Sequence, residues 1–359
     1  MCSIRRHLHA RFHDHSTTDR VSATLPAHHD PGPDAAIARA AAVSDAPSTG
    51  VTLRNGHRIR IGTASWTDRT ILPPGLFYPP DVSSAEDRLR FYASRFSMVE
   101  IDSSYYGLPI RRNSELWAER TPDGFTFDIK AYALMTGHPT EVARLPKALR
   151  EALPPSIASA KRVYPKDLPP EIYDEVWALF RHAIEPLIAA GKLGSVLLQY
   201  PQWFTPGTAA RNALLEARDR LRGVPCTVEF RSRQWLDPRA RERTLEFLRD
   251  HALPYVIVDE PQGLPNSVPP VAAVTAPTLS IVRLHGRRDD LWNRRGVAVV
   301  DKYRYLYDRD ELATWVPRVL EVAEKADETH VVFNNCYANY GTTNALEMAA
   351  MLAAAVDRG

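Results

Sequence analysis

The stretch TLSIVRLHGRRDD, residues 278–290, decides the fold because it starts as an apolar run and turns basic at its end. In a strand, side chains two residues apart share a face, so Arg283 and His285 lie on the same face. Gly286 interrupts the strand and two arginines follow it. Apolar strands that end in clustered polar groups are typical of the C-terminal mouth of a parallel (β/α)8 barrel, where ligands bind. We therefore predict a binding site around the end of this strand.

Seven other segments have the same apolar character and are rich in Val, Ile, Leu or Phe, as strands buried on both faces are. The eight predicted strands are residues 58–65, 98–104, 125–131, 194–200, 225–231, 254–260, 278–286 and 330–335. Helical patterns separate most of them, and one begins with Ser84 and Asp87 at the spacing of a capping box. This alternation predicts an α/β fold, a single-domain (β/α)8 TIM barrel over residues 51–359. An open doubly wound sheet is the alternative, but no strand precedes a glycine-rich nucleotide turn.

The composition is that of an ordinary globular protein. The chain has 359 residues, of which 44% are hydrophobic and 25% are charged. A net charge of +2 argues against a dedicated nucleic-acid binder. No apolar run reaches the roughly 18 residues that a membrane-spanning helix needs, so we expect no membrane partner and a cytoplasmic protein. The three cysteines lack metal-ligand spacing and are predicted to be reduced thiols.

The first 50 residues differ in texture from the rest of the chain. Ala, Ser, Thr, Asp, Pro, His and Arg dominate there, and long apolar stretches are absent. Because such a segment buries little apolar surface, we predict that residues 1–50 form a disordered N-terminal tail.

Several segments together carry a resemblance to a known family. In chain order they are IGTASW, LFYP, MVEIDSSYYGLP, FTFDIKA with the TGHP that follows, LGSVLLQYP, VEFR with Trp235, IVDEP, VRLHGR, YRYLY and FNNCYANYGTTNA. Over about residues 58 to 355 the chain resembles the YecE-like family, domain of unknown function 72. The resemblance implies a TIM-barrel fold and supplies no established activity.

Strand parity places charged and amide side chains inside the predicted barrel, near its C-terminal mouth. In MVEIDSS, Val99 and Ile101 face the helices, so Glu100 and Asp102 face the interior. The same rule selects Asp128, Lys130, Gln199, Glu229, Arg231, Asp259, Arg283, His285 and either Asn334 or Asn335. Because isolated charges are costly to bury, these groups must pair, bind a ligand or meet water. We expect a functional site, with a structural ion-pair network as the alternative for any single residue.

The candidate catalytic residues are the groups in this set that can move protons. Glu100 and Glu229 are the candidate acid and base, with Asp259 as a further carboxylate. His285 could assist proton transfer, with its pKa lowered by the neighbouring cation. Lys130 could form a Schiff base if its pKa were lowered, although nearby carboxylates favour a charged lysine.

The candidate substrate-binding residues are cations, amides and aromatic rings. Arg231, Arg283 and Arg287 would hold an anionic group, because a guanidinium matches a carboxylate or phosphate. The remaining predicted contacts are Asp102, Gln199, Asn334, Asn335 and two rings that could stack on a sugar or base, Trp66 and Tyr106. The turn GTTN, residues 341–344, could add anion binding at the start of the last helix.

The leading hypothesis is an enzyme of hydrolase or lyase type whose small-molecule, sugar-bearing or phosphate-bearing substrate has an anionic group. Two alternatives stay open. One is a non-catalytic protein that binds a phosphorylated ligand or nucleic acid. The other is an enzyme with a divalent metal on Glu100, Asp259 and His285, although no metal-binding spacing supports it. The sequence has no nucleotide-cofactor motif, and it determines neither the cofactor nor the oligomeric state.

Overall fold

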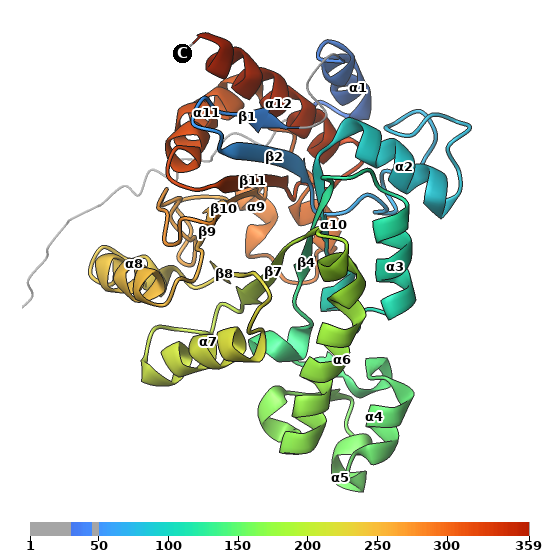
Figure 1. The fold of residues 1–359 in the computed structure, drawn as a ribbon, viewed down its shortest axis with the longest axis vertical. Helices are drawn as coiled ribbons and strands as arrows, with labels where there is room; N and C mark the ends of the chain where they lie inside the picture. The colour runs from blue at the N-terminus through green and yellow to red at the C-terminus, as the bar shows by residue number, and fades with distance from the viewer. Residues whose placement is uncertain (1–29, 45–49, 359) are drawn as a thin grey trace, which may run out of the picture.

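Parallel strands occupy the centre of the molecule and helices surround them (Figure 1). The computed structural model describes residues 30–44 and 50–358, which form one mixed α/β domain. Within those residues, no helix combines the length and the apolar character that crossing a membrane requires.

All eight predicted strands are present, each within two or three residues of its expected bounds. They are β2 (Arg58–Thr63), β3 (Met98–Ile101), β4 (Thr126–Lys130), β7 (Leu193–Tyr200), β8 (Cys226–Phe230), β9 (Val256–Asp259), β10 (Leu279–Leu284) and β11 (Glu328–Phe333). Three further short strands were not predicted: β1 (Val51–Thr52), which pairs antiparallel with β2, and the hairpin of β5 (Thr140–Glu141) and β6 (Arg162–Val163).

The strands form two main sheets, in the orders β1-β2-β11-β10-β9 and β3-β4-β7-β8. Apart from β1, every pairing in them is parallel. A single parallel bridge between Val228 and Tyr255 joins β8 to the start of β9. At the other side of the two sheets, β2 approaches β3 so closely that a side chain on Gly62 would overlap the Met98 carbonyl.

The helices follow the strands in sequence and cover their outer faces. The larger ones are α2 (Ala85–Arg95), α3 (Arg111–Glu119), α6 (Pro170–Ala189), α7 (Thr208–Arg220), α8 (Arg241–Asp250), α11 (Arg309–Ala323) and α12 (Tyr340–Arg358). As predicted, the Ser84 side chain caps α2 by accepting a hydrogen bond from Asp87 N at 3.0 Å. Shorter helices α4 (Lys147–Ala152) and α5 (Pro155–Ala158) belong to an excursion between β4 and α6 (Figure 1).

A further helix, α1 (Pro33–Ala41), corrects the prediction that residues 1–50 are disordered. It packs beside α12 (Figure 1). The Arg39 guanidinium donates to both carboxylate oxygens of Glu347, at 2.8 and 2.6 Å, and to the Tyr307 carbonyl at 2.6 Å. Residues 1–29 and 45–49 lie outside the described residues, so the prediction is wrong for α1 and untested there.

The close approach at Gly62 generates a stability prediction. The change Gly62→Ala should lower the free energy of unfolding by about 2 kcal/mol or more, because the new methyl group must push β2 and β3 apart. Gly107→Ala is the matched control, since no atom lies within 4 Å of a side chain built there. Urea unfolding of the two variants measures the difference. Equal stability of both variants would contradict the proximity of β2 and β3.

Candidate functional site

One buried guanidinium connects the two sheets. Arg283 on β10 donates through Nη2 to Glu100 Oε1 on β3 at 2.6 Å, and through Nη1 to Glu229 Oε2 on β8. All three side chains are at most 1% exposed. The Nε of Arg283 is buried and has no hydrogen-bond partner among the described residues. The structure therefore unites three of the predicted site residues from strands far apart in sequence.

Glu229 is surrounded by donors. Its Oε1 accepts a hydrogen bond from Gln199 Nε2 at 2.7 Å and lies 3.2 Å from Arg231 Nη1. The Nε2 of His285 lies 3.4 Å from the same oxygen. These contacts follow from register, because Gln199 pairs with Glu229 across β7 and β8 and so points to the same side.

We name the whole assembly the Arg283 cluster. Its members are the side chains that face one another between the strands near their C-terminal ends: Glu100, Asp102, Lys130, Gln199, Glu229, Arg231, Glu260, Arg283, His285 and Asn334. All but Glu260 were predicted to line the interior.

The two carboxyl groups bound by Arg283 have opposite pKa shifts. Burial raises the pKa of Glu100 to about 7, and the nearby charge of Asp102 adds to that effect against Arg283 and Lys130. Burial also opposes the charge of Glu229, but Arg283, His285 and Arg231 hold the pKa of its carboxyl well below its usual value. Near neutral pH, Glu100 can therefore gain and lose a proton, whereas Glu229 stays ionised.

His285 is neutral in this environment. Burial lowers its pKa to about 3, and Arg231 and Arg283 contribute, so the predicted direction of the shift is confirmed. The amide nitrogen of Asn334 lies 2.9 Å from His285 Nδ1. When that amide donates, Nδ1 accepts and the single ring proton is on Nε2, facing Glu229. Asn335 instead binds the Tyr305 carbonyl and Asn344, so Asn334 is the inward residue of the pair.

Lys130 is paired rather than reactive. Its Nζ lies 3.0 Å from Asp102 Oδ1 and 4.6 Å from the centroid of the Tyr105 ring. Burial opposes its charge, but Asp102 and Glu100 raise the pKa of the ammonium group. A lysine that stays protonated is a poor nucleophile, so Lys130 is not suited to form a Schiff base.

Exposure rises from the centre of the Arg283 cluster to its edge. The side chains of Arg283 and Glu229 are 0% exposed, whereas those of Arg231 and Asp102 are 15% and 30% exposed. Tyr106, predicted to bind substrate, lies at this outer edge with 49% exposure, and its ring contacts that of Tyr105. The cluster therefore meets solvent on the side of Asp102 and Tyr106.

The structure corrects the placement of Asp259. In the register of β9 and β10, Arg283 pairs with Val258 and Leu284 pairs with Asp259. Asp259 therefore points away from the interior, where it accepts from Arg287 Nε at 2.9 Å and from the Tyr307 hydroxyl at 2.6 Å. This placement also separates the proposed metal ligands Glu100, Asp259 and His285, and the described residues contain no group of three or more His, Cys, Asp or Glu arranged to hold a metal.

Three other predicted contacts have structural partners outside the cluster. Arg287 is held by two carboxylates, Asp259 and Glu311, so its guanidinium has no free edge for a substrate anion. Trp66 is 8% exposed and its ring packs edge-on against Trp117 of α3 at 5.9 Å. Residues 341–344 lie inside α12 and are buried, and the Thr343 hydroxyl donates to the Ala36 carbonyl of α1. The predicted anion site at this turn is therefore covered by α1.

Several residues near the cluster were not predicted. Glu260 Oε2 lies 3.3 Å from Arg231 Nη1. Burial lowers the pKa of His138, from the TGHP motif, to about 4, and the charges of Lys130 and Arg231 add to this effect. His138 lies several residues after the end of β4, so the alternation of side chains along a strand does not predict where it points. Its position in a polar motif after β4 was the only indication in the sequence that it lies near the site.

A segment between β10 and α11 covers His285. This cover segment, residues 287–305, contains the one-turn helices α9 (Asp289–Trp292) and α10 (Val299–Lys302). The rings of Trp292 and Tyr303 both lie 6.2 Å from the His285 ring, and the Arg231 guanidinium lies 5.1 Å from the Trp292 ring. Lys302 Nζ donates to the Trp292 carbonyl at 3.0 Å, which ties α10 to α9.

A second polar cluster lies at the opposite, N-terminal ends of the strands. His330 on β11 is bonded to Asp128 Oδ2 at 2.9 Å, and its other ring nitrogen lies 3.4 Å from Glu328. Arg60 on β2 donates to Glu328 at 2.7 Å and to the Gly124 carbonyl at 2.6 Å. Each charge in this cluster has an opposite partner, as expected of a structural ion-pair network.

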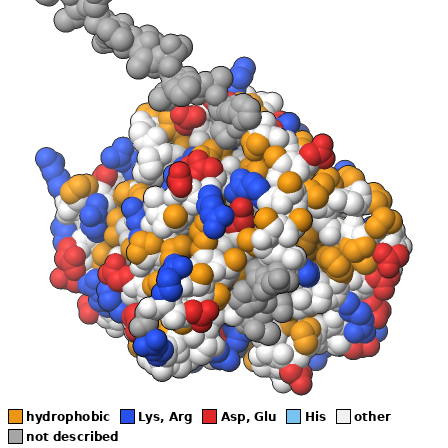
Figure 2. Space-filling model, turned by 90° about the horizontal axis from the view of Figure 1, so that it is seen from above, with side chains coloured by type: hydrophobic (Ala, Val, Ile, Leu, Met, Phe, Trp, Pro, Cys, Tyr) orange, Lys and Arg blue, Asp and Glu red, His pale blue; other side chains and the backbone are white. Residues whose placement is uncertain are grey.

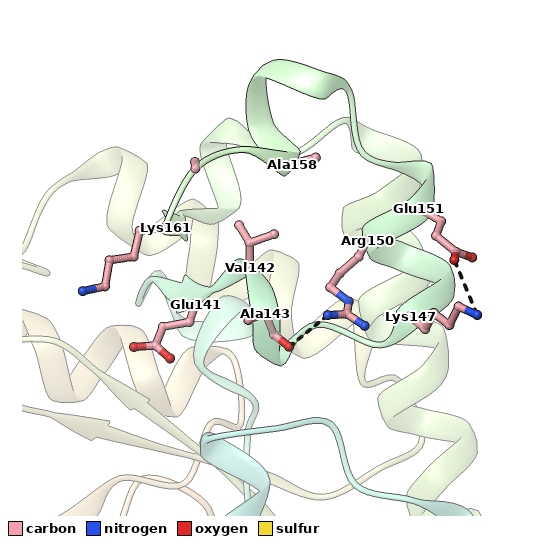
Figure 3. Close-up of a pocket in the computed structure, with 9 residues that line it drawn as sticks. Glu141, Val142, Ala143, Lys147, Arg150, Glu151, Ala158 and Lys161 are labelled. Atoms are coloured by element: carbon pink, nitrogen blue, oxygen red, sulfur yellow. Dashed lines mark hydrogen bonds and ion pairs between the residues drawn. The ribbon is translucent and has the colours of Figure 1, made fainter.

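A third group of charges lines a cavity of about 630 Å³ in the excursion that contains α4 and α5 (Figure 3). Its charged side chains turn toward one another or toward solvent: Lys147 pairs with Glu151 at 3.7 Å, and Arg150 donates to the Ala143 carbonyl at 3.5 Å. No described residue of this lining has a buried polar atom without a partner. We therefore assign the candidate site to the Arg283 cluster.

Comparisons with known proteins agree with the resemblance seen in the sequence. The profile of the family described as "Protein of unknown function DUF72" matches residues 60–358. The UPF0759 protein YunF of Bacillus subtilis is 30% identical over 301 residues, which cover 82% of this chain and 94% of that protein. Crystal structures of DUF72 family proteins from Enterococcus faecalis and Thermotoga maritima are 27% and 29% identical, with TM-scores of 0.63 and 0.64. Each covers 82% of this chain and 98% or 99% of its own.

The N-terminal polar cluster predicts how stability depends on pH. Although burial opposes a charge on His330, Asp128 and Glu328 raise its pKa from 6.5 to about 9. A raised pKa stabilises the fold below pH 6.5, and this contribution is lost as pH rises through about 9. His330→Gln should therefore cost on the order of 3 kcal/mol at low pH and progressively less toward pH 9.

Denaturant unfolding of the wild type and of His330→Gln tests this prediction. Measurements from roughly pH 6 to pH 10 span the titration of His330. His182→Gln is the control, because His182 is an exposed histidine on α6. A stability difference that grows with pH would show that the sign is wrong.

Proposed function

The chain belongs to the DUF72 family, and we propose that it is an enzyme that uses acid–base chemistry of hydrolase or lyase type at the Arg283 cluster. The observation that carries this proposal is the pair of buried carboxyl groups on one guanidinium, Glu100 and Glu229, whose environments shift their pKa values in opposite directions. Pairs of titratable groups separated in this way are typical of acid and base assignments in enzymes.

We also propose that the parallel strands close into a (β/α)8 barrel over residues 51–359. Supporting this, the Val228–Tyr255 bridge joins β8 to the start of β9, and β2 lies against β3 at Gly62. In such a barrel the Arg283 cluster occupies the C-terminal end, where enzymes of this fold place their chemistry.

Glu100 supplies the acid in this proposal. With a pKa of about 7 it is mostly protonated below neutral pH, and it transfers this proton to the leaving oxygen of the substrate. Glu229, which stays ionised, takes a proton from the attacking water, whose oxygen bonds to the substrate carbon as the bond to the leaving oxygen breaks. In a lyase variant Glu229 takes the proton from carbon and no water is added. Return of the proton from Glu229 to Glu100 through solvent restores both groups.

Charge balance favours an uncharged reacting group over the anionic group that the sequence predicted. The cluster contains three cations, Lys130, Arg231 and Arg283, and each is paired with carboxylates. Its four carboxyl groups are Glu100, Asp102, Glu229 and Glu260. An anion would have to displace one of them from its cation. A protein built to bind phosphate without turnover would leave cations unpaired, so nothing here favours that second function.

The cover segment lies over part of the Arg283 cluster, whose central carboxyl groups are buried. Glu100 and Glu229 are 1% and 0% exposed, and the rings of Trp292 and Tyr303 lie over His285. Loops that close over a site exclude water and strengthen electrostatic interactions inside it. We propose that the cover segment opens to admit substrate on the side of Asp102 and Tyr106.

The pKa of Glu100 predicts the pH dependence of turnover. Because the acid must be protonated, kcat/KM should fall as pH rises through about 7, and Glu100→Gln should remove this limb together with about 10²-fold or more of the rate. Glu229→Gln should lower the rate by a similar factor at every pH, because Glu229 is ionised throughout.

The measurement is the rate of hydrolysis of a panel of aryl glycosides and aryl esters, monitored through the chromogenic phenol that is released. Glu175→Gln, at an exposed position on α6, is the control and should behave as the wild type. If turnover persists undiminished in both Glu100→Gln and Glu229→Gln, these carboxyl groups have no part in the chemistry.

A further inference from the structure

A second cavity lies beside the outer edge of the Arg283 cluster. It has a volume of about 610 Å³ and is lined by Gly137, Tyr164, Pro165, Lys166 and Trp203. These residues come from three separate loops, which follow β4, β6 and β7. Trp203 is 63% exposed and Tyr164 is 40% exposed. Large aromatic side chains this exposed have no role in the core, so their placement around one cavity requires another explanation.

A continuous series of ring contacts connects this cavity with the cluster. The Trp203 ring lies 5.7 Å from the His138 ring, which lies 5.3 Å from the ring of Tyr105. Tyr105 contacts the ring of Tyr106 at 5.1 Å and the ammonium group of Lys130 at 4.6 Å. We name the four rings of this series and Tyr164, which lines the same cavity as Trp203, the aromatic rim: Tyr105, Tyr106, His138, Tyr164 and Trp203.

We propose that the aromatic rim binds an uncharged oligosaccharide chain, with the reacting unit at the Arg283 cluster and further sugar units extending toward the cavity beside Trp203. This inference rests on the proposed function and names its substrate class. Sugar rings have apolar faces that stack on aromatic side chains and hydroxyl groups that stay in contact with water. Such a ligand suits rings that are half exposed along an open edge.

The arrangement of charges selects an uncharged chain over a nucleic acid, the other polymer that stacks on aromatic rings. Binding a phosphate backbone requires several unpaired cations along its path. Lys166 is the one cation in the described lining of the cavity. Farther along the loops, Arg144 is paired with Glu141 at 3.2 Å. Elsewhere on the surface, on the face seen from above in Figure 2, basic and acidic side chains are intermixed, with no extended area of one sign.

The rim also predicts that chain length matters. The cavity and the Arg283 cluster are separate places joined by the rings of His138 and Tyr105, so one sugar unit cannot occupy both. A longer chain can contact several rings at once. Each added stacking contact should therefore increase affinity until the chain reaches Trp203.

The test is a binding titration of the full chain, measured by calorimetry. The probes are hexasaccharides of β-1,4-linked glucose, xylose, mannose and N-acetylglucosamine and of α-1,4-linked glucose, the corresponding monosaccharides, and a short single-stranded DNA. We expect at least one hexasaccharide to bind about tenfold or more tightly than its monosaccharide. Trp203→Ala and Tyr164→Ala should each weaken that hexasaccharide about tenfold. Ile188→Ala, an exposed apolar side chain at the end of α6, is the matched control and should change nothing.

The inference is overturned if no hexasaccharide binds, if Trp203→Ala binds like the wild type, or if only the DNA binds. Glu229→Gln separates this outcome from failure of the proposed function. If Glu229→Gln loses turnover but the wild type binds no hexasaccharide, the proposed oligosaccharide binding by the aromatic rim is wrong and the proposed function is not. Hexasaccharide binding that depends on Trp203, together with full turnover in Glu229→Gln, would overturn the catalytic roles alone.

Discussion

The interior of this protein depends on the ionic contact that Arg283 makes with Glu100 and Glu229. These three residues come from β10, β3 and β8, so the contact joins the two sheets across the space between them. Burying a guanidinium and two carboxyl groups is costly, and removing one partner leaves an uncompensated charge that typically costs about 3–5 kcal/mol. A purely apolar interior would serve stability as well. That the charges are nevertheless placed together is the physical reason for assigning them a chemical role.

Much of this arrangement follows from the sequence because parallel strands obey simple rules. The eight apolar segments were recognisable, and parity placed Glu100, Glu229 and Arg283 on one side without knowledge of the fold. Parity was wrong at Asp259, since VIVD is apolar on both faces and gives no sign of which residue faces inward. The neighbouring Glu260 was missed for the same reason. The pairing of β9 with β10 is what shows which residues of β9 face inward.

Features that depend on contacts between loops were beyond sequence reasoning. His138 and Tyr303 follow strand ends at distances that no periodicity describes, so their positions around the cluster could not be inferred from the sequence. Helix α1 is a different case, because its sequence had signals that the overall composition obscured. Pro33 at the first turn, Asp34 beside it and five alanines after it all favour a helix. Because the first 50 residues have a low apolar content on average, the nine residues that fold as a helix against α12 were not recognised.

The contacts of α1 extend to the segment that covers the site. Asp30 is bonded to Arg304 and Tyr340, and the Arg304 carbonyl accepts a hydrogen bond from Arg288, so the beginning and end of the cover segment are fastened together beside α1. The family match begins only at residue 60. A protein shortened to that boundary would lose β1, the first two residues of β2 and the contacts of Asp30 with Arg304 and Tyr340, and would expose the side of α12 that packs against α1. Domain limits taken from shared sequence are therefore too narrow for biochemical work on this chain.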